Sequence, residues 1–294
     1  MQHVVLIGGS GYVGQAFQEV LERRGLSFRN ISRSDVDYYH HKNLKEVLIS
    51  EKPDFLINAA GYTGKPNVDA CEEDKTNCLL GNAILPGIIR EVCEDLTLSW
   101  GHISSGCIYT SKGTDGAPFV EEDEPNFSFR TNNCSFYSGT KALGEEILAG
   151  AENCFVWRLR IPFDERNNRR NYLTKLLTYD RLLDAENSIS HRFEFVNACL
   201  DCFAKEIPFG TYNMTNLGSI TAREITEIMK SHGLVDKELQ FFENEEEFMD
   251  QTAKAPRSNC TMSSEKLRKV GIQMREVHEA VNSACTNWVV EELV

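Results

Sequence analysis

The stretch that decides the fold of this chain reads HVVLIGGSGYVG, residues 3–14. Residues 3–7 form an apolar run typical of a buried strand, and apolar residues at helical spacing follow from Val13 to Leu21. The turn between them carries glycines at the spacing Gly8, Gly11 and Gly14. This order predicts a dinucleotide site, because glycines let the backbone approach a pyrophosphate and the helix start presents free amides to it. We expect Tyr12 and Val13, at that helix start, to contribute to the site.

Strands and helices continue to alternate beyond this turn. We expect strands at residues 27–31, 54–58 and 96–104, and helices around residues 44–48 and 83–95. This βαβα order predicts an α/β protein with a Rossmann-type, doubly wound parallel sheet. The strict alternation ends near Arg160. We therefore expect an NADP-binding domain over residues 1–160 and a smaller C-terminal substrate-binding lobe over residues 161–294, partly interleaved with the last strands of the sheet.

The end of the second expected strand bears on the choice of cofactor. An NAD enzyme places a carboxylate there for the ribose 2′-hydroxyl, whereas this chain has Arg33, whose guanidinium favours the 2′-phosphate of NADP. Asp35 or Asp37 could take the ribose instead, so NADPH is the expected cofactor and NADH the alternative. The small residues of Asn58-Ala59-Ala60, after the third strand, would let the nicotinamide ribose approach. Close helix packing is the other interpretation of that segment.

Composition excludes several classes of partner. The net charge of -13 over 294 residues, without a basic cluster, argues against binding to nucleic acid or to an anionic membrane. Ten scattered cysteines with no apparent secretory segment indicate reduced thiols and a cytoplasmic protein. The pair Cys199 and Cys202 lacks a second ligand pair, so we expect no metal.

Four residues with chemical capacity follow the sheet. Ser105 and Cys107 come directly after an expected strand, and Tyr137 and Lys141 open a helix. Residues four apart share a helix face, so the phenol and the ammonium would point into one cleft, where the ammonium would lower the phenol pKa from its reference value near ~10. The pattern predicts a tunable proton donor. The other interpretations are a surface tyrosine with a solvated lysine, and a cysteine that serves only as a small buried hydrophobe.

With these residues the chain resembles the extended short-chain dehydrogenase/reductase family. More narrowly, it resembles the plant and giant-virus UDP-4-keto-6-deoxyglucose 3,5-epimerase/4-reductases that make UDP-L-rhamnose. The resemblance covers nearly the whole chain. Its most specific segments are residues 58–69 (NAAGYTGKPNVD), 105–108 (SGCI), 119–127, 158–162 (RLRIP), 167–175 and 257–259 (RSN). The chain departs from the family pattern at Lys65, where arginine is usual, and in an apparent insertion at residues 129–134, which could cover the sugar pocket or only extend the surface.

The resemblance implies roles for individual residues. Ser105, Tyr137 and Lys141 would form the reductase triad, and Cys107 with Lys175 would be the proton-transfer pair for epimerisation. We assign Cys107 as the base and Lys175 as the acid with the direction open, and His191 is the rival acid. The matching segments also imply a set of substrate-binding residues: Thr63, Asn67, Ser105, Arg160, Asn171 and Arg257. Arg257 is expected to grip the substrate diphosphate, with a structural salt bridge as the alternative.

The expected function is therefore conversion of UDP-4-keto-6-deoxyglucose to UDP-L-rhamnose by epimerisation at C3 and C5 and NADPH-dependent reduction at C4. The resemblance implies a homodimer through helices near residues 83–95 and 136–150, and an upstream 4,6-dehydratase that supplies the substrate. Three alternatives stay open: a plain 4-reductase resembling dTDP-4-dehydrorhamnose reductase, an enzyme resembling GDP-fucose synthase, and a non-catalytic NADP-binding regulatory subunit. The nucleotide of the sugar, UDP, dTDP or GDP, is not determined by the sequence.

Overall fold

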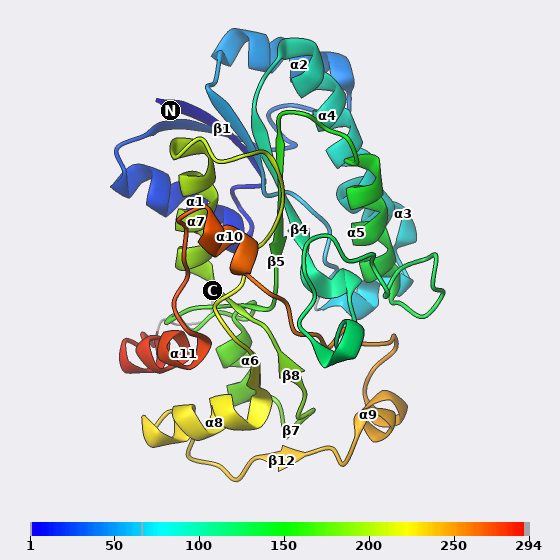
Figure 1. Ribbon diagram of the computed structural model, residues 1–294, viewed down its shortest axis with the longest axis vertical. Coiled ribbons are helices and arrows are strands. Elements are labelled where there is room, and N and C mark those ends of the chain that lie inside the picture. The colour runs from blue at the N-terminus through cyan, green and yellow to red at the C-terminus, as the bar shows by residue number, and fades with distance from the viewer. Residues whose placement is uncertain (1, 66, 291–294) are drawn as a thin grey trace.

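A parallel sheet forms the centre of the molecule (Figure 1). The structure is a computed structural model that describes residues 2–65 and 67–290. In these residues the six strands lie in the order β10-β5-β4-β3-β1-β2. Their bounds are β1 His3–Ile7, β2 Ser27–Ile31, β3 Phe55–Asn58, β4 Trp100–Ser105, β5 Cys154–Leu159 and β10 Gly210–Asn213. Every neighbouring pair is parallel, so the doubly wound α/β fold expected from the alternation is confirmed.

Helices cover both faces of this sheet. In Figure 1, α1 (Tyr12–Arg23) and α7 (Arg192–Ala204) lie on the left, and α2 (His41–Glu51), α4 (Leu85–Leu96) and α5 (Phe136–Ile147) lie on the right. The central strands β1 and β3 are buried along nearly their whole length, whereas the edge strand β2 alternates between exposed and covered residues. This is the pattern of a parallel sheet with helices on both faces. Separate apolar cores fill the two sides.

A lobe below the sheet in Figure 1 is built from short elements around its own apolar core. Its helices are α6 Tyr172–Thr178, α8 Ala222–Ser231, α9 Glu245–Gln251 and α11 Val277–Thr286, whereas α10 Glu265–Lys269 packs against β10 and places Leu267 in the core of the sheet. Three two-stranded ladders join them: β6 Pro162–Phe163 with β9 Ser190–His191, β7 Arg181–Leu182 with β12 Gln240–Phe241, and β8 Glu186–Asn187 with β11 Ile220–Thr221. Between the lobe segments the chain returns to the sheet as α7 and β10.

Short helices complete the crossovers of the sheet. They are η1 Val68–Glu72, α3 Lys75–Leu79, η2 Leu80–Ile84, η3 Gly106–Ile108 and η4 Thr114–Gly116. The expected strand 96–104 is shorter than predicted, because α4 runs to Leu96 and Thr97 takes a left-handed conformation (φ 52°) that ends it. No helix within residues 2–65 and 67–290 has the length and apolar character needed to span a membrane.

Candidate active site

The glycine turn after β1 lies directly against the segment after β3. Gly8 has φ +86°, and a side chain there would place its Cβ 2.4 Å from the backbone nitrogen of Ala60. A Cβ on Gly14 would lie 2.1 Å from the oxygen of Gly8. The turn therefore requires glycine at both positions, and the two segments predicted to bind the cofactor come together at the sheet edge.

The start of α1 is open to an anion. Its N-cap, Gly11, offers no side-chain acceptor to the first amides of the helix, and its first turn carries no acidic residue. Side chains hold the preceding turn in place: Asn30 Oδ1 accepts from the amide of Gly9 at 3.0 Å, and Gln18 donates to the oxygen of Gly9 at 2.8 Å. Free amides and the helix dipole fit a dinucleotide pyrophosphate at this point.

Asn58 shapes the second cofactor segment from within. Its side chain is fully buried, shares a 3.0 Å hydrogen bond with His102 Nδ1, and accepts from the amide of Ala60 at 3.1 Å. Burial lowers the pKa of His102 well below its usual value, so the imidazole is neutral. Asn58 thus acts on the backbone of Ala60, while Ala59 and Ala60 form the part of the segment that is not fully buried.

In the loop after β2, Arg33 is exposed, whereas the carboxylate of Asp35 is engaged in hydrogen bonds within the loop. Asp35 accepts hydrogen bonds from the hydroxyl of Ser32 at 2.7 Å and from its amide at 3.1 Å, and these bonds lower the pKa of Asp35. Ser34 Oγ lies 2.6 Å from Ser32 Oγ. The loop therefore presents the exposed guanidinium of Arg33, which suits a phosphate better than a ribose hydroxyl, while the hydroxyl of Ser32 already donates to Asp35.

Ser105 and Cys107 lie at the carboxyl end of β4, where the strand turns into η3. The amide of Cys107 donates to Ser105 Oγ at 3.2 Å, which caps η3. Burial raises the pKa of the Cys107 thiol, and hydrogen bonds from Ser105 and Ser138 oppose that rise. The thiol is 6% exposed, so it is a protonated group in a dry pocket rather than a solvated nucleophile.

Tyr137 and Lys141 reach the same place from α5. Burial raises the pKa of Tyr137 well above its usual value, the charge of Cys107 adds to this rise, and a hydrogen bond from Ser105 opposes it. Burial also lowers the pKa of Lys141. The expected clustering of these four residues is therefore present, but burial outweighs the lowering of the phenol pKa that we expected from the ammonium.

A buried ion pair stands one helical turn beyond Lys141. Arg158 Nη2 lies 2.8 Å from Glu145 Oε2, with the two side chains 5% and 10% exposed. The hydroxyl of Ser104 also donates to Glu145, at 2.6 Å, and Arg158 donates to the hydroxyl of Tyr109 at 2.9 Å. The charge of Glu145 is thus balanced by Arg158. Lys141 bonds instead to the main-chain oxygen of Ile103.

Lys175 belongs to α6 in the lobe and is partly buried. Burial lowers the pKa of Lys175, and the positive charges of Arg170 and Arg257 lower it further. Arg170 donates to the oxygen of Gly64 at 3.0 Å. Three cationic groups therefore gather beside the loop that follows β3, which suits an anionic substrate.

Several predicted substrate-binding residues have partners inside the protein. Arg257 forms a two-fold ion pair with Asp69 at 2.6 and 2.8 Å, so the structural salt bridge that we left open is present. Asn67 caps η1 through the amide of Asp69 at 2.9 Å, and Thr63 is exposed. Arg160 is 5% exposed and donates to Asn187 Oδ1 at 2.5 Å.

Asn171 is fully buried at the start of α6. Its Oδ1 accepts from the amide of Leu173 at 3.0 Å, and its Nδ2 donates to Asp164 Oδ1 at 2.9 Å. In the protein alone the side chain therefore positions the helix that carries Lys175.

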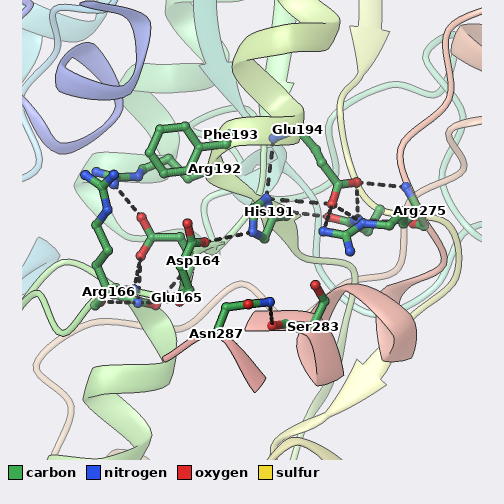
Figure 2. Close-up of polar contacts among 12 residues, drawn as sticks. Asp164, Glu165, Arg166, His191, Arg192, Phe193, Glu194, Arg275, Ser283 and Asn287 are labelled. Atoms are coloured by element: carbon green, nitrogen blue, oxygen red, sulfur yellow. Dashed lines mark hydrogen bonds and ion pairs between the residues drawn. The ribbon is translucent and has the colours of Figure 1, made fainter. Parts of the chain in front are cut away.

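His191 occupies a different network, shown in Figure 2. Its two ring nitrogens face carboxylates: Nε2 lies 3.4 Å from Glu165 and Nδ1 lies 3.7 Å from Glu194. Arg275 pairs with the same Glu194 at 2.5 Å. His191 caps α7 through the amide of Glu194 at 3.4 Å. Its partners are those of a structural histidine.

The inserted residues 129–134 lie along α5. The ring of Phe129 packs on Gly139 and on the ring of Phe136, 5.2 Å away, and Arg130 makes a two-fold bond to Glu146 at 2.8 and 2.6 Å. Phe129 and Arg130 thus extend the surface along α5, whereas Cys134 at the other end of the insertion lies close enough to Cys107 for a charge there to raise its pKa.

Sequence reasoning missed Ser138, Glu145, Arg158 and Arg170. Ser138 is buried beside Cys107 and lowers the pKa of its thiol, and it lies three residues before Lys141, a spacing that shares a helix face. A signal existed for Glu145, which is four residues from Lys141 on the same face. The ten cysteines are free, and within the described ranges three metal-ligating side chains do not gather anywhere.

Comparison with known proteins places this geometry in a family. The family described as "RmlD substrate binding domain" matches residues 1–289 of this chain. A trifunctional UDP-glucose 4,6-dehydratase/UDP-4-keto-6-deoxy-D-glucose 3,5-epimerase/UDP-4-keto-L-rhamnose-reductase of Arabidopsis thaliana is 30% identical, over 94% of this chain and 40% of its own length. The chain therefore spans about two fifths of that relative. A bifunctional dTDP-4-dehydrorhamnose 3,5-epimerase/dTDP-4-dehydrorhamnose reductase of the same plant is 29% identical, over 94% of this chain and 90% of the relative.

Solved structures share the fold. The UDP-rhamnose synthase of Acanthamoeba polyphaga mimivirus superposes with a TM-score of 0.89 at 20% identity, over 97% of this chain and 99% of that one. The dTDP-4-dehydrorhamnose reductase of Bacillus anthracis, solved in complex with NADP, has a TM-score of 0.81 at 18% identity, over 96% and 98% of the two chains.

Proposed function

Because the chain belongs to the RmlD substrate binding domain family, we propose that it is a bifunctional 3,5-epimerase and NADPH-dependent 4-reductase. Its substrate is UDP-4-keto-6-deoxyglucose and its product is UDP-L-rhamnose. The observation that carries the proposal is that Tyr137 and the buried Lys141 of α5 meet Cys107 at the end of β4, where Lys141 donates to the oxygen of Ile103 at 2.9 Å and the amide of Cys107 donates to Ser105 Oγ at 3.2 Å. A reductase needs the tyrosine and the lysine, and only proton transfer at carbon gives the thiol a role.

Epimerisation uses the acidity of the protons beside the ketone. C3 and C5 flank C4, so removal of a proton from either carbon leaves an enolate whose charge lies on O4. The hydroxyls of Ser105 and Tyr137 supply hydrogen-bond donors for that oxygen in a pocket where such bonds are strong. Inversion then requires a base on one face of the sugar and an acid on the other.

Burial favours the neutral forms of the two proton-transfer groups. It raises the pKa of the Cys107 thiol, which suits a proton donor, and lowers the pKa of Lys175, which shifts the lysine toward the role of a proton acceptor. We therefore assign Lys175 as the base that removes each proton and Cys107 as the acid that returns one. This direction is the opposite of the assignment made from the sequence.

Reduction follows epimerisation, because a C4 alcohol no longer acidifies its neighbours. The glycine turn and the α1 amides would hold NADPH, with Arg33 at its 2′-phosphate, and the bound cofactor would supply the hydride for C4. Tyr137 gives its proton to O4, and its raised pKa keeps the phenol protonated until that step. Lys141 carries the positive charge beside the phenol and binds the nicotinamide ribose.

The test incubates the purified protein with UDP-4-keto-6-deoxyglucose in deuterated water, with and without NADPH. Deuterium at C3 and C5 is followed by NMR together with the identity of the product. Exchange at both carbons and formation of UDP-L-rhamnose are expected. Reduction of a pre-epimerised sugar without exchange would reduce the function to a plain 4-reductase. NADPH binding without turnover would favour a regulatory subunit. Faster turnover of the dTDP sugar than of the UDP sugar would mean that the substrate carries dTDP and not UDP.

The oligomeric state, the location of the protein and the source of the substrate also belong to the proposal. We propose a cytoplasmic homodimer that receives its substrate from a 4,6-dehydratase. A dehydratase activity is named together with the epimerase and reductase in the trifunctional plant relative. Light scattering gives the mass of the particle, and a coupled assay starting from UDP-glucose with a separate dehydratase tests the supply of substrate.

A further inference from the structure

A buried ion pair between Asp164 and Arg192 lies next to the start of α1, where the cofactor-binding turn ends. Asp164 follows β6, and Arg192 is the first residue of α7. Arg192 Nη2 lies 2.5 Å from Asp164 Oδ2, and the side chains are 3% and 0% exposed (Figure 2). Neither residue is assigned a step of the proposed chemistry, although Asp164 also accepts a hydrogen bond from Asn171 at the start of α6.

The pair holds Tyr12, the first residue of α1. Arg192 Nη1 donates to the main-chain oxygen of Tyr12 at 2.9 Å, and the guanidinium lies 4.1 Å from the centre of the tyrosine ring. Burial raises the pKa of Tyr12, and the charge of Asp164 raises it further. Tyr12 is therefore gripped on its backbone and on its ring at the point where the α1 amides face the cofactor.

Arg192 acts through Tyr12 and not as a phosphate ligand. Its two terminal nitrogens are already engaged, its remaining Nε is buried without a partner, and almost none of its surface is exposed. Burying two charges costs desolvation energy that their attraction only partly offsets, so such a pair is weak support for stability alone. Fixing the position of Tyr12 gives the pair a role that an apolar pair of the same size would not supply.

We propose that Arg192 and Asp164 are positioning residues for NADPH, which hold the start of α1 in the orientation that binds the cofactor pyrophosphate. The inference rests on the proposed function only in that the chain binds NADPH.

The chain contains a matched control. Arg166 forms a two-fold ion pair with Glu19 at 2.8 and 2.9 Å, which also joins the segment after β6 to α1. Arg166 also lies over the ring of Phe193, 5.1 Å from its centre, as Arg192 does at 4.7 Å. Glu19 is about two helical turns beyond Tyr12, so this pair contacts the same helix away from the turn.

The test measures NADPH dissociation constants by nucleotide fluorescence, together with KM for NADPH and kcat. The double variant Asp164→Asn/Arg192→Met removes both charges and so leaves no unpaired buried ion. We expect it to weaken NADPH binding roughly tenfold and to raise KM more than it lowers kcat, because one charge-assisted hydrogen bond is lost. Arg192→Lys should fall between the double variant and wild type, and Arg166→Gln should bind NADPH within about twofold of wild type.

Unchanged NADPH affinity in the folded double variant would overturn the inference. Equal weakening in Arg166→Gln would also overturn it, because the effect would then come from loosened packing of α1. If thermal unfolding shows that the double variant does not fold, Arg192→Lys decides by the same measurements. A wild-type protein that does not bind NADPH would instead remove the proposed function, and the two failures are thereby distinguished.

Discussion

The ammonium of Lys141 donates a 2.9 Å hydrogen bond to the main-chain oxygen of Ile103, two residues before Ser105 on β4. The bond ties the face of α5 that carries Tyr137 to the strand that carries Ser105. Because Lys141 is 5% exposed, this carbonyl replaces the water that the charge has lost. The lysine therefore aligns the two halves of the proposed active site in addition to its electrostatic effect.

The reduction step should lose activity as pH rises through the pKa of Lys141. Burial places that pKa below the usual value of 10.5, whereas the raised pKa of Tyr137 keeps the phenol protonated over the same range. The rate at C4 is measured from pH 6 to 10.5 with a pre-epimerised substrate. In Lys141→Arg the guanidinium stays charged, so the alkaline fall should move to higher pH even if the maximum rate is lower. An unmoved fall would mean that another group titrates.

Removal of either proton-transfer group should give a different isotope pattern. In Lys175→Met we expect deuterium exchange at C3 and C5 to fall roughly 10²- to 10⁴-fold, because the base is gone. In Cys107→Ala exchange should continue on one face while inversion is lost, because the base can return a deuteron but the acid is absent. NMR resolves both readouts. The reverse pattern would make the thiol the base, and Cys134→Ser, in the inserted loop, is the control.

The ion pair behind the active-site helix should control stability. Arg158→Met leaves Glu145 charged and buried without its partner, and we expect a loss of roughly 3–5 kcal/mol in the free energy of unfolding. The double variant Glu145→Gln/Arg158→Met leaves no unpaired charge, so its loss should be clearly smaller. Urea unfolding measures both. Equal losses would show that packing, and not the unpaired charge, accounts for the effect.

The exposed Arg33 should determine cofactor preference. Arg33→Ala should raise KM for NADPH roughly tenfold and leave KM for NADH unchanged, because the guanidinium addresses only the 2′-phosphate. Arg29→Ala is the matched control, since Arg29 lies on β2 and pairs with Glu51 on α2. A parallel change with both cofactors in Arg33→Ala would assign the residue to the loop structure.

His191 should contribute to stability and not to catalysis. His191→Ala should cost roughly 1–2 kcal/mol through loss of the α7 cap, with isotope exchange at C3 and C5 retained. The histidine lowers the pKa of Glu165 to about 2 from 4.5, so this pair stabilises the wild type above pH 4.5 and is lost as pH falls from 4.5 to 2. Unfolding at pH 6 and pH 3 should therefore differ less in the variant. Loss of inversion with exchange retained would restore His191 as the acid.

Local patterns predicted the elements whose apolar spacing is unambiguous. The strand Ser27–Ile31 has the bounds expected from the sequence. The pattern failed at residues 96–99, where apolar Leu96 and Leu98 read as strand although the first ends α4. Thr97 takes φ 52° there, and a conformation of that kind is set by the packing of the helix end and not by residue type.

The active-site residues divide in the same way. Ser105, Cys107, Tyr137 and Lys141 could be named from the sequence, because a strand end and one helix face bring residues of known spacing together. Ser138 at the thiol, Arg158 behind the lysine and Arg192 at Tyr12 could not, because each lies far in sequence from at least one of its partners.

The sequence by itself determined the parallel sheet, the glycine turn with its helix, and the residues that can do the chemistry, since these depend on apolar periodicity and on contacts within a few residues. Only the tertiary structure decided the directions of their pKa shifts and the residues that hold them in place. Burial, which depends on the whole fold, raises the pKa of Cys107 and lowers that of Lys175, against the roles first assigned. The Asp164–Arg192 grip on Tyr12 likewise exists only once the chain after β5 has returned to the sheet, because its charges are about 150 to 180 residues from the turn they hold.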